Sequence, residues 1–65
     1  MIVNFLYSLD FKLLQETKNI DFVPIIGSLV KIGCFKYKVN SVIYVLDDNY
    51  FNVKLERIHD LSSNS

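Results

Sequence analysis

The sequence predicts a small, mainly β domain, a bent antiparallel sheet or barrel of about five strands. Two observations lead to this prediction. Turn residues divide positions 23–58 into short segments: Pro24, Gly27, Gly33 and an Asp-Asp-Asn triplet at 47–49. Within these segments apolar and polar residues alternate, which is the period of a β-strand. The length of 65 residues allows one domain at most, placed at residues 1–59, with a flexible polar tail at 60–65.

The first strand is expected at the N-terminus, where Val3, Phe5 and Tyr7 alternate with other residues. Its other face carries Ile2 and Leu6, so this strand is apolar on both sides. Residues 11–20 fit either a second strand or a short helix at 11–19. The strand is favoured because a short turn suffices for a hairpin, whereas an isolated ten-residue helix is marginal in water.

A connection follows at residues 21–27. Pro24 restricts Val23 to an extended conformation, and Gly27 permits a tight turn. Residues 29–32 then form a short strand that ends at Gly33.

The longest strand is expected at residues 35–46, and its alternation changes phase at Asn40. Phe35, Tyr37 and Val39 share one parity, whereas the apolar residues from Val42 onward continue on the other. A one-residue slip of this kind indicates a β-bulge, which bends a sheet sharply. After the acidic turn, residues 50–58 alternate again and form the last strand.

Apolar residues on both faces of two strands predict self-association. The second face would carry Ile2, Leu6, Ile43 and Val45. A contiguous exposed apolar patch usually marks an interface, so we expect a homo-oligomer, most simply a dimer with two-fold symmetry. The alternative is that a helix at 11–19 covers this face within one chain.

A second surface combines basic and aromatic residues: Lys36, Lys38, Tyr50 and Lys54. Lysines on outward strand positions protect strand edges from aggregation, or they contact a protein or an anionic ligand. Nucleic acid is possible but not favoured as a partner, because the net charge is zero and such binding depends on excess positive charge.

Residues for catalysis or metal binding are sparse. Cys34 and His59 are single, which excludes an internal disulfide and the usual zinc sites. Asp47 and Asp48 are too few for a calcium loop and are expected to serve the turn. We therefore expect no enzymatic activity, no cofactor and no metal.

The sequence also bears on location. No apolar run approaches the roughly 20 residues that span a membrane, and the N-terminus lacks the basic start of a signal peptide. The lone Cys34 fits a reducing compartment. The expected location is the cytoplasm of a bacterial host, with no membrane partner.

The arrangement of these segments resembles that of small SH3-like barrels. The resemblance covers residues 23–58 and depends on Val23-Pro24 with Gly27, on the strand at 29–32, on Tyr37-Lys38-Val39, and on the acidic hairpin before Val53-Lys54-Leu55. It implies a binding module without catalytic residues, of a type frequent in phages and mobile elements. The expected function is stoichiometric inhibition of a host defence or regulatory protein. The alternatives are a nucleic-acid or nucleotide-ligand binder and a minor structural component of a virion.

Overall fold

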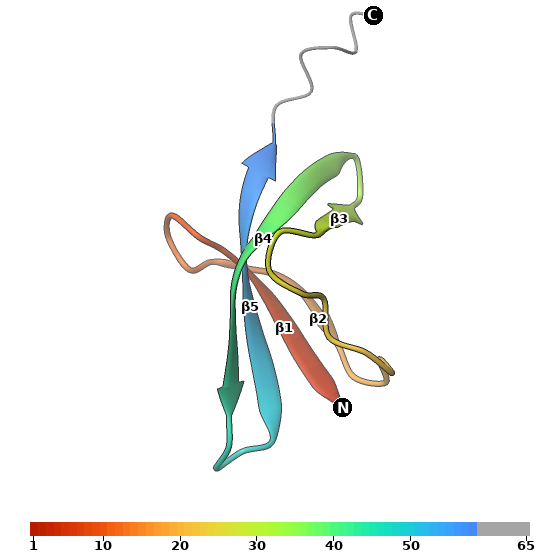
Figure 1. The fold of residues 1–65 in the computed structure, drawn as a ribbon, viewed down its shortest axis with the longest axis vertical. Coiled ribbons are helices and arrows are strands. Elements are labelled where there is room, and N and C mark those ends of the chain that lie inside the picture. Colours follow the sequence, from red (N-terminus) through yellow and green to blue (C-terminus); the bar gives the residue numbers. More distant parts are fainter. Residues whose placement is uncertain (59–65) are drawn as a thin grey trace, which may run out of the picture.

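The computed structural model describes residues 1–58, and that part of the chain contains five β-strands and no helix. The strands are β1 (Ile2–Tyr7), β2 (Leu13–Thr17), β3 (Leu29–Ile32), β4 (Phe35–Val45) and β5 (Tyr50–Ile58). They form one sheet in the order β2-β1-β5-β4-β3, which curls into a half-barrel (Figure 1). The mainly β class is confirmed, and residues 13–17 form a strand, not a helix. The expected tail at 60–65 lies outside the described residues.

The sheet is mixed, because its two hairpin regions meet in a parallel pair. β1 runs parallel to β5, with Val3 opposite Phe51 and Phe5 opposite Val53. The pairs β1–β2, β3–β4 and β4–β5 are antiparallel. Turn signals in the sequence predict only antiparallel neighbours, because they identify hairpins and not the contacts between hairpins. A parallel pair needs a long crossover, and here everything from β2 to β4 serves as that crossover.

The core lies on the inner side of the curled sheet. Its buried side chains are Val3, Phe5, Tyr37, Val39, Val53 and Leu55. They come from the three middle strands, on which alternate residues face the same side. Val53 and Leu55 are among them, two residues apart as the alternation expected for the last strand requires.

β4 contains the bulge that the change of phase predicts. Its pairing with β5 shifts between Val39 and Ser41, which leaves Asn40 as the extra residue. Val39 opposite Leu55 and Val42 opposite Val53 therefore both face inward, although they are an odd number of residues apart. β4 bends along its length and follows the curl of the sheet (Figure 1).

Two tight turns join the last three strands. Gly33 and Cys34 connect β3 to β4, and Gly33 has a φ of 62°. The acidic turn connects β4 to β5 and ends at Asn49, which has a φ of 57°. The Tyr44 hydroxyl donates a hydrogen bond of 2.8 Å to Asn49 Oδ1, and the Tyr44 ring lies 4.6 Å from that of Phe51. Both turns are where the sequence predicts them.

The connection between β2 and β3 runs along the inner side of the sheet. Ile20 and Val23 of this connection pack against the buried core. It ends in a turn in which the Ser28 N–H donates to the Ile25 carbonyl at 3.1 Å. Gly27 has a φ of 92° there, as the third residue of a type II turn requires. The Gly27 N–H also donates to the Val39 carbonyl at 2.9 Å, which anchors the connection to β4.

Candidate functional site

The side of the three middle strands that faces away from the core is called the outer face. Its side chains are Ile2, Asn4 and Leu6 of β1, Lys36, Lys38, Ser41, Ile43 and Val45 of β4, and Tyr50, Asn52, Lys54, Glu56 and Ile58 of β5. Successive strand residues point to opposite sides, and the sequence neighbours Val3, Phe5 and Val53 are buried in the core. The structure thus brings the residues expected to mediate self-association onto one face: Ile2, Leu6, Ile43 and Val45.

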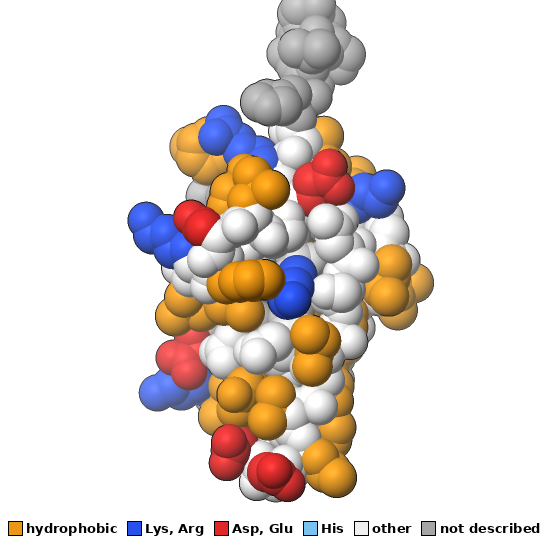
Figure 2. All heavy atoms as spheres, turned by 90° about the vertical axis from the view of Figure 1, so that its left-hand side faces the viewer, with side chains coloured by type: hydrophobic (Ala, Val, Ile, Leu, Met, Phe, Trp, Pro, Cys, Tyr) orange, Lys and Arg blue, Asp and Glu red, His pale blue; other side chains and the backbone are white. Residues whose placement is uncertain are grey.

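An apolar row crosses the outer face, formed by Ile2, Tyr50 and Val45. Ile2 is directly opposite Tyr50, and Tyr50 is directly opposite Val45. Ile43 lies next to the row on β4 and is 43% exposed. Figure 2, which looks onto this side of the molecule, shows hydrophobic side chains reaching the lower end, where acidic ones lie. A helix at 11–19 does not cover the row, because that segment contains edge strand β2.

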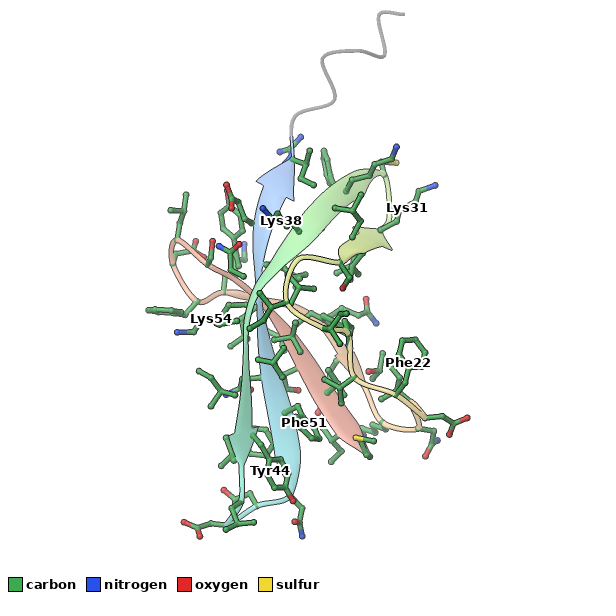
Figure 3. All side chains as sticks on the ribbon, in the orientation of Figure 1. Phe22, Lys31, Lys38, Tyr44, Phe51 and Lys54 are labelled. Carbon is green, nitrogen blue, oxygen red and sulfur yellow. The ribbon has the colours of Figure 1, made fainter. Side chains whose placement is uncertain are left out.

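Two polar contacts lie on the same face. Asn4 Nδ2 donates a hydrogen bond of 3.3 Å to Asn52 Oδ1, next to the apolar row. Farther from the row, Lys54 Nζ lies 4.3 Å from the centre of the Phe11 ring. Figure 3 shows Lys54 pointing to this side of the sheet. Lys54 is therefore a fixed positive charge on one side of the apolar row.

The residues expected to contact a partner lie in two regions of the outer face. Tyr50 and Lys54 lie on the outer face, among the residues expected for self-association. Lys36 and Lys38 lie on the other side of the β4 bulge, where Lys36 is opposite Lys31, and Lys38 is opposite Glu56. Tyr50 and Lys54 thus lie among the apolar residues, and Lys36 and Lys38 occupy the far half of β4 on the same face.

The β2–β3 connection creates a second apolar surface, which the sequence analysis does not identify. Two grooves flank residues 23–25, with volumes of about 520 and 560 Å³. Both are lined almost entirely by apolar side chains, among them Phe22, Ile25 and Ile26, which are exposed. Figure 3 shows Phe22 on the side of the molecule away from Lys54. The available signal was the composition of this connection, because an ordinary loop is rich in turn-forming polar residues.

Among the candidates for reactive chemistry, the structure describes Cys34, Asp47 and Asp48. Cys34 is exposed in the β3–β4 turn, and His59 lies outside the described residues. Asp47 and Asp48 lie in the turn that ends β4. Within residues 1–58 no group of three or more His, Cys, Asp or Glu side chains is placed to hold a metal ion. The same residues include no helix long and apolar enough to cross a membrane. The prominent features of the described surface are therefore the outer face and the two grooves.

The five-stranded half-barrel is compatible with the SH3-like barrels that the sequence resembles. Comparison of the chain with protein-family models, with curated proteins and with solved structures finds no significant match. A function is therefore inferred from the surfaces of the domain.

Proposed function

We propose that this chain is a small non-enzymatic protein that acts by stoichiometric binding and works as a homo-oligomer, most simply a dimer. The observation that supports the proposal is the apolar row Ile2–Tyr50–Val45 on the outer face. Contiguous apolar surface on a soluble domain usually marks an interaction site. A domain of 65 residues also buries little surface of its own, so association adds stability that the small core does not supply.

The partner contact belongs to a different surface in this proposal. A dimer that uses the outer face covers Tyr50 and Lys54, but the grooves beside residues 23–25 lie along the inner side and stay open. An apolar segment of another protein fits such grooves. The finer proposal is that the partner protein belongs to a bacterial host. In this proposal the chain is a phage-type inhibitor of that partner in the cytoplasm. That proposal is supported by the SH3-like resemblance, and using the assembled chain as bait tests it.

Self-association is tested by Val45→Lys, which places a charge in the middle of the apolar face. Leu9→Lys is the matched control, because Leu9 is 79% exposed in the β1–β2 loop and lies off this face. Light scattering over a dilution series should give the mass of two chains for wild type and for Leu9→Lys. For Val45→Lys we expect a dissociation constant of the dimer at least about tenfold higher, a change of roughly 1.4 kcal/mol in the free energy of association. The circular dichroism spectrum should be unchanged. A wild-type monomer throughout the series would refute the proposal.

Binding of an anion, such as a nucleic acid or a nucleotide, is the second candidate function. The observation that favours it is that Lys31 and Lys36 are directly opposite each other on β3 and β4, with Lys38 nearby. Lysine side chains neutralise phosphates when a nucleic acid binds, and this group of lysines supplies such charges. Salt-dependent binding of single-stranded DNA that Lys36→Glu abolishes would support this function. Salt-insensitive binding to a protein would favour the first, and co-purification with virion proteins would indicate a structural role.

A further inference from the structure

We propose that the partner on the outer face is a second copy of this chain, related by a two-fold axis that runs along the apolar row. In this arrangement Lys54 of each copy faces the acidic turn, Asp47 and Asp48, of the other copy. The inference rests on the proposed self-association and adds its geometry. Two sheets packed in this way lie about 10 Å apart, so side chains of both faces interdigitate.

The charges of the outer face lie at different distances from the apolar row along the strands. Lys54 follows Tyr50 by four residues on β5, which is about 13 Å along the strand. Asp47 follows Val45 by two residues, and β4 runs in the opposite direction to β5. The Asp47 backbone is therefore about 7 Å from the row on the other side, and its side chain extends farther. Figure 2 shows acidic side chains at the lower end of this face, where the β4–β5 turn lies in Figure 1. The Lys54 side of the row thus carries three lysines, Lys36, Lys38 and Lys54, and one acid, Glu56, whereas Asp47 and Asp48 lie on the other side.

The direction of the two-fold axis determines which residues of the two copies meet. In a two-fold dimer the same surface patch is used by both copies. An axis along the row places Ile2, Tyr50 and Val45 of one copy on the same residues of the other. It also reverses the strand direction, so the Lys54 side of one copy meets the acidic side of the other. An axis parallel to the strands would instead place lysine near lysine and aspartate near aspartate, which costs free energy.

The positive charge of Lys54 is held in place. The Phe11 ring lies over Lys54 Nζ at 4.3 Å, and such a contact contributes roughly 0.5–1 kcal/mol at an exposed site. Phe11 makes this contact from a backbone φ of 58°, which bulky residues rarely adopt. The Lys54 side chain is thus directed onto the outer face before any partner binds, which reduces the entropy lost on association.

The test exchanges the charges between two variants. Lys54→Glu removes the excess of positive charge from its end of the face, where Lys36, Lys38 and Glu56 also lie. The double variant Asp47→Lys, Asp48→Lys makes both ends basic. We expect each variant alone to self-associate at least about tenfold more weakly than wild type. Mixing the two should restore association, because in the heterodimer residue 54 of each copy is opposite charges of the other sign at 47 and 48. Native mass spectrometry distinguishes the heterodimer from both homodimers by mass.

Two control variants and one condition complete the experiment. Lys54→Gln removes the Phe11 contact without reversing the charge and should weaken association less than Lys54→Glu. Asp21→Lys reverses an exposed charge on the β2–β3 connection and should leave association unchanged. The wild-type dimer should also weaken as salt is raised. A dissociation constant of the wild-type dimer that does not change with salt, or a mixture of the two variants without heterodimer, would refute the two-fold arrangement. Neither result would contradict the proposed function. A wild-type monomer would refute both.

Discussion

At the residue scale, a glycine is required at position 33 because of its backbone conformation and not because of a lack of space. Gly33 opens the two-residue turn between β3 and β4 with a φ of 62°. A Cβ atom added there would meet no heavy atom within 4 Å. The absence of a side chain is therefore not needed for space. It is needed because residues with a Cβ disfavour positive φ, which two-residue hairpin turns require at their first residue.

Gly33→Ala should lower the free energy of unfolding by about 1–2 kcal/mol, the cost of the left-handed conformation for a residue with a Cβ. Gly33→Asn should cost less, because Asn tolerates that conformation. Urea unfolding followed by circular dichroism measures both changes. Cys34→Ala is the neighbouring control, since Cys34 is exposed and should tolerate the change. Equal stability of Gly33→Ala and wild type would contradict the turn geometry.

At the element scale, the bulge in β4 keeps one strand in register with the core along its whole length. Without the extra residue Asn40, the residues on one side of the bulge would turn to the opposite face. Val39 and Tyr37 are both buried and lie on the N-terminal side of the bulge. Their burial therefore depends on one inserted residue and not on the nature of its side chain.

Deletion of Asn40 should remove the cooperative unfolding transition, because a one-residue slip moves the apolar side chains of half of β4 to the outer face. Asn40→Ala should change the free energy of unfolding by no more than about 0.5 kcal/mol, since Asn40 is exposed. Thermal unfolding followed by near- and far-ultraviolet circular dichroism compares the two variants with wild type. A deletion variant that unfolds as wild type does would show that the strand pairs in another register.

At the scale of the whole molecule, the sequence predicts what depends on neighbouring residues and misses what depends on distant ones. The turns at Gly33 and 47–49, the bulge at Asn40 and the alternation in β5 are local, and all are confirmed. The parallel contact of β1 with β5 joins residues 2–7 to residues 50–55, and no local pattern encodes it. The apolar composition of the β2–β3 connection is a local signal for the grooves beside Pro24, but the distant residues that complete their walls, Phe5, Val42 and Phe51, are not predictable from it.

The central position of β5 has a consequence for the order in which the protein folds during synthesis. β5 is the last of the five strands to leave the ribosome, and it pairs with both β1 and β4. Until then the β1–β2 hairpin has no neighbour on its β1 side, and an isolated hairpin is marginally stable at best in water. Val3 and Phe5 stay uncovered during that interval, which exposes the nascent chain to aggregation. The sheet is therefore completed only after β5 has left the ribosome.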